Sequence, residues 1–320
     1  MDNLTHSLVG ALIGQAGLKQ KTGLAMPALI IGANLPDIDA ACFFWLDGVE
    51  HLGFRRGITH GPIALVLLPL ILAGMLWGYD RWQAMRATRS EERLSVSLKW
   101  LFLLSFIGCL THSALDWLNV YGIRLLEPFS SRWFYGDTLF IIDVWLWVLL
   151  GAATWWSLRK EKQGAEWARP ARIALSMAGV YILSNGVITG VAERGYEQAE
   201  HRHIIASPKP FTFWEREMIT YQEHPAGWTY PFLGDWSVFG GKREIPVPLG
   251  GRTPLEACAS LDAGSQGEQD AFWFWSRVPF LEYCEDGTTL LRDARFYDPL
   301  ARGRFTVKLP NSSKAEPIGD

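Results

Sequence analysis

The sequence lacks a strong charge of either sign. Its 30 lysines and arginines nearly balance 33 aspartates and glutamates, and neither half of the chain is markedly basic. Proteins that bind nucleic acid usually carry a basic face or stripe, so this balance argues against nucleic acid as a partner. The start of the chain also lacks the positive residues that open a secretory signal peptide, so we expect the first apolar segment to stay in the mature protein.

Cysteine is scarce, and its four positions differ in setting. Cys42 and Cys109 lie in apolar segments, where a cysteine usually serves as a small hydrophobic residue. Cys258 and Cys284 share the C-terminal half of the chain. They would pair if that half is exported to an oxidising compartment, and the sequence leaves this alternative open.

Long apolar runs are missing from residues 194–320 but frequent in residues 1–193. A membrane-spanning helix needs about 20 mostly apolar residues. The candidate spans are 57–79, 173–192, 99–119, 138–158, 4–18 and 23–46. The last two are weaker, and we expect them to form a helical hairpin whose second helix breaks near Pro36. Many of the 16 tryptophans stand at the ends of apolar runs, as is typical at lipid headgroups.

The fold class follows from this division. Residues 1–193 predict an α-helical multi-pass membrane domain with about five to six membrane helices, one of them broken. Residues 194–320 predict a soluble, mostly β domain, because short aromatic and β-branched runs alternate there with glycine and proline. The expected strands are 211–214, 228–232, 272–275 and 304–309.

Loop charges predict the orientation of the membrane domain. The loops 80–99 and 159–172 are rich in arginine and lysine, and the turn at 19–23 carries two further lysines. Positive loops normally stay in the cytoplasm. Threading six spans in this way leaves both ends of the membrane domain outside, so the C-terminal half is also expected on the outer side of the membrane.

Ionisable residues interrupt the apolar segments. Each costs about 2.5–3.5 kcal/mol on insertion, so such groups normally face a partner or a wet cavity. His112 and Asp116 are four residues apart and share one helix face. The predicted orientation brings all of these groups to the outer side of the membrane. They are His6, Asp37, Asp39, His60, His112, Asp116, Asp137 and Asp143.

The residue types predict a metal site. The expected ligands are His6, Asp37, Asp39, His60, His112 and Asp116. Six nitrogen and oxygen ligands exceed the four of a single zinc ion and suit two ions about 4 Å apart. Without thiolates, zinc, manganese and iron all remain open, with zinc favoured. Threonines that precede the histidines, or backbone carbonyls, are expected to hold the imidazoles. Asp143 and Asp137 are the candidate general bases.

These residues also have structural interpretations. A single histidine at a helix end is more often hydrogen-bonded than a ligand, and the pair of His112 and Asp116 could simply join helices. Arg55 and Arg56 ordinarily anchor a span at the membrane edge. Beside a metal, Arg56 would instead bind a phosphate or carboxylate of the substrate.

Five motifs occur in order within residues 1–195. They are Met1-Asp2-x-x-Thr5-His6, Asn34-x-Pro36-Asp37-x-Asp39, Arg56-Gly57-x-Thr59-His60-Gly61, Thr111-His112-x-x-x-Asp116-Trp117-x-Asn119-x-Tyr121-Gly122 and Tyr135-Gly136-Asp137 with Ile142-Asp143. Together they resemble the bacterial inner-membrane metal-dependent hydrolase family, some members of which are described as LexA-binding. The resemblance implies a membrane-embedded hydrolase that uses these histidines and aspartates as metal ligands. It also implies the bacterial inner membrane as the location, so the outer side on which the C-terminal half is expected would be the periplasm.

The sequence thus predicts a divalent-metal hydrolase that acts on an ester or phosphoester of a lipid or lipid-linked substrate at the outer face of the membrane. A metal or proton transporter, or a non-enzymatic regulatory membrane protein, stays open as an alternative. A transport pathway should continue to the cytoplasmic side. The inner parts of the spans, 64–77, 100–107 and 144–158, carry no ionisable group, which favours a one-sided site.

Overall fold

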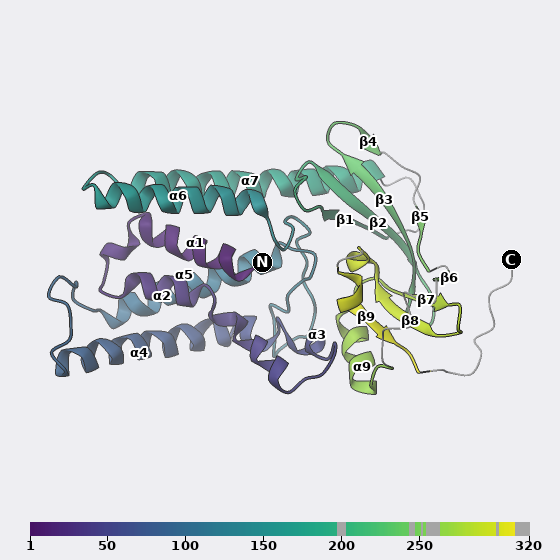
Figure 1. Ribbon diagram of the computed structural model, residues 1–320, viewed down its shortest axis with the longest axis horizontal. Helices are drawn as coiled ribbons and strands as arrows, with labels where there is room; N and C mark the ends of the chain where they lie inside the picture. The colour runs from purple at the N-terminus through teal and green to yellow at the C-terminus, as the bar shows by residue number, and fades with distance from the viewer. Residues whose placement is uncertain (197–202, 243–246, 251, 254–262, 299–300, 311–320) are drawn as a thin grey trace. The chain divides into compact units, whose positions relative to one another are not determined.

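The computed structural model describes residues 1–196, 203–242, 247–250, 252–253, 263–298 and 301–310 (Figure 1). The chain forms two compact units. The first comprises Met1–Asp39, Arg56–Val187 and Pro210–Phe213, and the second comprises Ala40–Arg55, Ile188–Lys209 and Trp214–Asp320. Each unit therefore includes a short segment from the other half of the sequence. The predicted boundary after residue 193 stays a prediction.

The first unit is a bundle of helices. Its long helices are α1 (Asn3–Gln15), α2 (Ala25–Gly32), α4 (Ala64–Met85), α5 (Leu98–Trp117), α6 (Val144–Lys162) and α7 (Ala168–Tyr196), the last of which continues into the second unit. Short 3-10 helices connect them: η1 (Leu18–Gln20), η2 (Leu35–Phe44, which also continues into the second unit) and η3 (Ile58–His60). Figure 1 shows α1, α2, α4 and α5 running alongside one another.

Two apolar clusters hold this bundle together. One joins α1, α6 and α7 through residues such as Leu12, Leu150 and Ala174. The other joins α2, α4 and α5 through residues such as Leu29 and Leu104. The backbones of α2 and α5 approach so closely that glycine is required between them. A Cβ added at Gly108 would lie 2.8 Å from the carbonyl oxygen of Leu29.

Three of the described helices, α4, α5 and α7, are long and apolar enough to cross a membrane. A fourth span results if α2 and η2, bent by 51° at their break, count as one. The predicted break near Pro36 is confirmed, whereas the predicted five to six spans are not. With 13 residues, α1 reaches about 20 Å, less than the hydrocarbon core of about 30 Å. The last turn of α6 is charged, with Arg159, Lys160 and Lys162.

The second unit contains two β-sheets, which confirms the β-rich C-terminal half. The first sheet has the order β1-β2-β3-β4, with β5 also paired to β3, and is antiparallel. Its strands are β1 (His203–Pro208), β2 (Glu215–Glu223), β3 (Thr229–Ser237), β4 (Gly241–Lys242) and β5 (Val247–Pro248).

The second sheet has the order β6-β7-β8-β9, and only its β6–β7 pair is parallel. Its strands are β6 (Arg252–Thr253), β7 (Pro279–Cys284), β8 (Thr289–Asp293) and β9 (Thr306–Lys308). Two helices, α3 (His51–Phe54) and α9 (Gln266–Trp275), pack together in this unit.

Two of the four expected strands were wrong. Residues 272–275 belong to α9, because Ser265 and Glu268 form a capping box that starts a helix. Phe272 and Trp275, three residues apart, are both buried, as neighbours on one helix face are. Residues 211–214 form no strand. There the ring of Phe213 packs in the first unit, with its centroid 5.8 Å from that of Trp145 and 5.7 Å from that of Tyr181. Residues 228–232 lie largely in β3, and 304–309 contain β9.

The cysteines differ as expected. Cys42 and Cys109 are buried thiols. Cys284, at the end of β7, is disulfide-bonded. Cys258, whose pairing with Cys284 the sequence leaves open, lies outside the described residues.

Candidate metal centre

The candidate centre is built from three places in the first unit. His112 and Asp116 lie in the last two turns of α5, four residues apart, on one buried face. Asp37 lies in η2, directly after the break that follows α2. His60 ends η3, and α4 begins only at Ala64. The predicted span thus starts at residue 57, seven residues before the start of α4. The difference arises because Ile58–His60 form the separate 3-10 helix η3.

Four of the six predicted ligands converge. One ligand atom from each of Asp37, His60, His112 and Asp116 lies within 4.8 Å of the others. We call these four residues the metal group. The Nε2 atoms of His60 and His112 are 3.2 Å apart. Asp116 Oδ2 lies 3.6 Å from the first nitrogen and 3.7 Å from the second. Asp37 Oδ1 lies 3.9 Å from Nε2 of His112.

A backbone carbonyl orients His112. Its Nδ1 lies 2.7 Å from the carbonyl oxygen of Ala33, the residue that caps the C-terminus of α2. A carbonyl oxygen can only accept a hydrogen bond, so Nδ1 of His112 carries the hydrogen. In the neutral ring, Nε2 then has a lone pair directed at the metal group. The close contact between α2 and α5 thus determines which nitrogen is available as a ligand.

A threonine and an aspartate orient His60. The hydroxyl of Thr59 lies 3.1 Å from Asp39 Oδ2, to which it donates, and 2.9 Å from Nδ1 of His60. Because its single hydrogen is used on Asp39, the hydroxyl accepts from Nδ1. Nε2 of His60 therefore also carries a lone pair. Asp39, predicted as a ligand, lies behind His60, 3.7 Å from Nδ1, and also accepts from the backbone N–H of Arg56 at 2.7 Å.

Only one of the three threonines that precede a histidine has the predicted role. Thr5 donates to Asp2, and Thr111 donates to the carbonyl of Gly108 within its own helix. The Thr-His pair that recurs at these three positions therefore does not imply a shared environment, because each pair lies near the start or end of a different element.

His6 lies beside the metal group without being one of its four members. Its ring stacks on that of His112 with 3.9 Å between centroids. Its Nε2 is 3.3 Å from Asp116 Oδ1, a carboxylate that the amino group of Met1 also contacts. His6 and Asp116 are fully buried. His6 thus contacts two members of the metal group, His112 and Asp116.

Arg56 is part of the centre. Its Nε lies 3.1 Å from Asp116 Oδ2, and its Nη1 donates to Asn119 Oδ1 at 3.0 Å. The guanidinium stacks over Tyr121 at 4.5 Å. These contacts bury Arg56, which does not suit an anchor at the membrane edge. The sequence does not predict that Asn119 and Tyr121 contact Arg56, although both belong to the motif that begins at Thr111.

The two predicted general bases have different positions. Asp143 caps α6 by accepting from the N–H of Leu146 at 2.9 Å, and its other oxygen accepts from the hydroxyl of Tyr181 at 2.9 Å. Asp137 is buried in a loop that packs against the end of α5, where the N–H of Thr138 donates to the carbonyl of Leu118 at 2.8 Å. Neither belongs to the metal group.

The metal group fits a divalent cation. Both imidazoles present a lone pair, and both carboxylates are acceptors, so their closest atoms repel one another unless a cation lies between them. Two nitrogen ligands of a tetrahedral zinc ion are about 3.3 Å apart, given zinc–nitrogen bonds near 2.05 Å. The separation of 3.2 Å between the two Nε2 atoms matches this value. Nitrogen and oxygen ligands equally suit manganese or iron.

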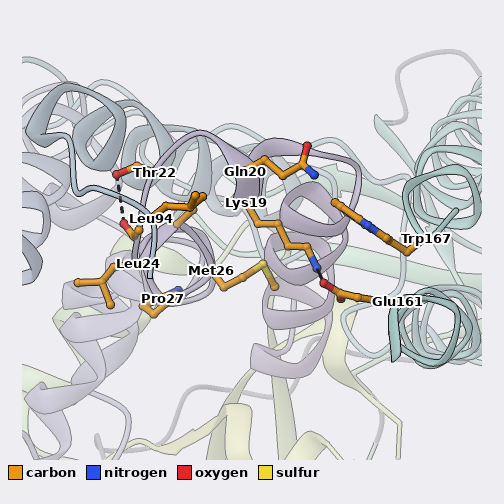
Figure 2. A pocket seen from close by; sticks show the side chains of 11 residues that line it. Lys19, Gln20, Thr22, Leu24, Met26, Pro27, Leu94, Glu161 and Trp167 are labelled. Atoms are coloured by element: carbon orange, nitrogen blue, oxygen red, sulfur yellow. Dashed lines mark hydrogen bonds and ion pairs between the residues drawn. The ribbon is translucent and has the colours of Figure 1, made fainter. Parts of the chain in front are cut away.

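A pocket of about 440 Å³ lies elsewhere in the first unit (Figure 2). It is lined by residues of the α1–α2 turn, such as Lys19, by Met26 at the start of α2, and by Leu94, Glu161 and Trp167. Lys19 pairs with Glu161 and lies 4.0 Å from the ring centre of Trp167. These residues stand at the ends of α1, α2 and α5 opposite to the metal group. The pocket is therefore not the metal centre.

Comparison with known proteins assigns a family. The chain matches the YdjM inner membrane protein family over residues 1–192. It is also similar to "Uncharacterized protein YfhP" of Bacillus subtilis (strain 168), with 25% identity over 167 residues, or 49% of this chain and 47% of that protein. The chain thus spans about half the length of this curated relative. No solved structure matches. Because the family match covers more than half of the chain and contains the whole metal group, the chain belongs to the YdjM inner membrane protein family.

Proposed function

We propose that this protein is a membrane-embedded, metal-dependent hydrolase of an ester or phosphoester in a lipid or lipid-linked substrate. The observation that carries the proposal is the convergence of Asp37, His60, His112 and Asp116. These residues come from three separate segments and are otherwise costly in an apolar bundle. Membership in an inner membrane protein family supports a substrate that the bilayer supplies.

The four residues would hold one divalent ion, and His6 is the candidate ligand for a second. A divalent ion bound there would lower the pKa of a bound water toward about 7 and stabilise negative charge that develops on the substrate. The number of ions is a prediction that metal analysis tests directly.

The chain's own residues supply orientation and charge. Thr59 and Asp39 hold the ring of His60, and Ala33 holds that of His112. Contacts with Asp116 and Asn119 hold the guanidinium of Arg56 beside the metal group. A phosphate or carboxylate of a substrate bound there would therefore meet this guanidinium. This supports the predicted substrate-binding role of Arg56.

Asp137 is the better candidate for a general base. The two described hydrogen bonds of Asp143 engage both of its oxygens in holding α6 and α7. Asp137 is buried in the loop that packs on the end of α5, where Thr138 bonds to Leu118, two residues after Asp116 in the chain. A base in this loop would take a proton from the attacking water and return it to the leaving group.

The first test is the metal content of the full chain purified in detergent. We expect at least one divalent ion per chain in the wild type, and loss of this ion in His112→Ala combined with Asp116→Ala. Ser113→Ala is the matched control, because Ser113 is equally buried in α5 but is not a ligand. A wild type with far less than one ion per chain would overturn the proposed centre, as would an unchanged double variant.

The second test separates hydrolysis from transport. Phospholipids and lipid phosphates are incubated with the metal-loaded protein, and the released headgroup or phosphate is measured. Hydrolysis that disappears in the double variant and persists in Ser113→Ala supports the enzyme. Metal uptake into proteoliposomes without any hydrolysis would instead support the transporter alternative.

A further inference from the structure

Residues Ala40–Arg55 form a loop, here called the 40–55 loop, whose two ends meet beside the metal group. Asp39 precedes the loop and Arg56 follows it. The N–H of Arg56 donates to Asp39 Oδ2 at 2.7 Å, which closes the loop at its base. The same two residues contact His60 and Asp116, respectively. The 40–55 loop is thus joined along the chain, at both ends, to residues that contact the metal group.

One side of the loop is packed within the second unit. The N–H of Val49 donates to Glu268 of α9 at 3.2 Å, and Leu52 is fully buried. A Cβ added at Gly53 would lie 3.2 Å from the Cβ of Ala271, so α3 and α9 are in close contact. These contacts give the loop a defined shape, with one covered side.

The other side of the loop exposes large apolar rings. Phe44 is 91% exposed, Trp45 60% and Phe43 54%. The ring of Trp45 meets that of Phe54 edge to face at 6.0 Å, and the guanidinium of Arg55 lies 5.6 Å from the ring centre of Phe43. Leaving such large apolar side chains in water is unfavourable relative to burying them. A cluster of this kind marks a surface that contacts something apolar.

The position of the loop along the chain identifies what it contacts. The bent candidate span formed by α2 and η2 ends at Phe44, and the span α4 begins at Ala64. The chain therefore leaves and re-enters the bilayer within about 20 residues, and the loop remains near the lipid headgroups. Aromatic rings flanked by arginine are the residues that favour this level, with the rings among the acyl chains and the cation near phosphate.

We propose that the 40–55 loop is a lipid-binding loop that inserts Phe43, Phe44 and Trp45 at the membrane interface. The bound partner is phospholipid of the bilayer in which the protein resides. The residues at the base of the loop, Asp39 and Arg56, contact His60 and Asp116 of the metal group. The further step, that this lipid is the substrate, rests on the proposed function.

A fluorescent label tests the insertion. Phe44→Cys, in the full chain with Cys42→Ala, is labelled with an environment-sensitive dye and reconstituted into nanodiscs of phosphatidylethanolamine and phosphatidylglycerol. Asp286→Cys, in the exposed turn between β7 and β8, is the control. We expect lipid that carries a headgroup nitroxide to quench the dye at position 44 several-fold more than at position 286. Equal quenching at both positions would overturn the proposal, as would a dye shielded by a second protein copy.

A pair of variants tests the link to the metal group. Phe44→Ser with Trp45→Ser should keep the bound metal and the cleavage of a water-soluble short-chain ester, but lose most cleavage of bilayer lipid. Phe239→Ser, an equally exposed aromatic residue after β3, is the control and should lose nothing. Unchanged cleavage of bilayer lipid in the double variant would show that the loop does not serve the site. If the wild type lacked metal, only the proposed function would fail, because quenching at position 44 does not depend on metal.

Discussion

At the scale of single residues, the two central histidines are held by different groups. His112 relies on the backbone of Ala33, whereas His60 relies on the side chains of Thr59 and Asp39. A side chain can be removed by mutation without moving the backbone, so the two histidines can be tested separately. We therefore expect the orientation of His60, as a candidate ligand, to be more easily lost by mutation of a neighbour than that of His112.

Thr59→Val is predicted to weaken metal binding by about 10- to 100-fold, the usual effect of losing a group that orients a ligand. The hydroxyl that connects Asp39 to His60 is lost while the size of the side chain is kept. Competition with a chromogenic chelator measures the affinity. Thr111→Val is the matched control, because that hydroxyl bonds within α5 to Gly108. Equal affinities of the two variants would contradict the assigned role of Thr59.

A second prediction concerns Glu217 in β2. Burial raises the pKa of Glu217 to about 7, and nearby Asp235 and Asp298 add to this effect while Lys209 opposes it. Asp235 stands directly opposite Glu217 on β3. Since the folded state favours the protonated carboxyl, its contribution to stability is complete below the ordinary pKa of 4.5 and is lost as pH rises through about 7.

Glu217→Gln should therefore remove part of the pH dependence of unfolding. At pH 8 the variant is expected to be more stable than the wild type by roughly 3.5 kcal/mol, since each pKa unit between 4.5 and about 7 is worth about 1.4 kcal/mol. At pH 4 the difference should vanish. Hydrogen exchange of the β1–β3 amides at the two pH values measures this. A wild-type advantage at pH 8 would show that the carboxylate is stabilising.

At the scale of elements, the packing of α2 on α5 is the feature on which the site depends. Gly32 and Gly108 let the two backbones approach, with an added Cβ at Gly32 only 2.7 Å from the carbonyl oxygen of Ser105. Small residues serve helix contacts in membranes in this way. The same approach brings Ala33 to His112 and Asp37 to the metal group.

Gly108→Val should separate α2 from α5 and thereby lose the hydrogen bond from His112 to Ala33. We expect most of the bound metal to be lost, together with a lower thermal unfolding temperature. Gly151→Val in α6 introduces the same side chain where nothing lies within 4 Å, so it should behave like the wild type. Metal content and unfolding temperature are measured on both. Full metal content in Gly108→Val would mean that the contact does not position the ligand.

The elements themselves were partly predictable. Long uncharged runs predicted α4, α5 and α7, and proline predicted the break after α2. Their ends were less predictable, since Gly57–Ile63 is as apolar as a helix but turns to present His60. Similarly, the aromatic run of α9 was predicted as a strand because ring content favours strands. The capping box at Ser265 had greater influence, because it satisfies the first N–H groups of a helix.

At the scale of the whole molecule, the two compact units exchange segments. The 40–55 loop belongs with the C-terminal half, and Pro210–Phe213 belongs with the helices, where the carbonyl of Phe211 accepts from the indole of Trp145 at 2.9 Å. A truncation after residue 193 would remove partners from both units. The C-terminal half is therefore an integral part of the protein and not an appended module.

The predicted orientation places the C-terminal half in the periplasm. Alkaline phosphatase fused after Asp320 should be active, and the same enzyme fused after Glu92, in the basic loop between α4 and α5, should be inactive. The disulfide bond of Cys284 supports an oxidising compartment. The reverse pattern of activities would show that the loop charges were misinterpreted, and would move the metal group to the cytoplasmic side.

The sequence alone determined that the first half is a membrane protein and that the second half is rich in β-structure, and it predicted that histidines and aspartates of the first half form a metal site. These properties depend on composition, periodicity and residue type, which are local. Only the tertiary structure decided which residues meet at the site. It brought Asp37, His60, His112 and Asp116 together, placed Asp39 behind His60, and gave Asp143 to a helix cap. Convergence depends on how closely helices approach and where each one ends, and those are properties of packing between segments far apart in the chain.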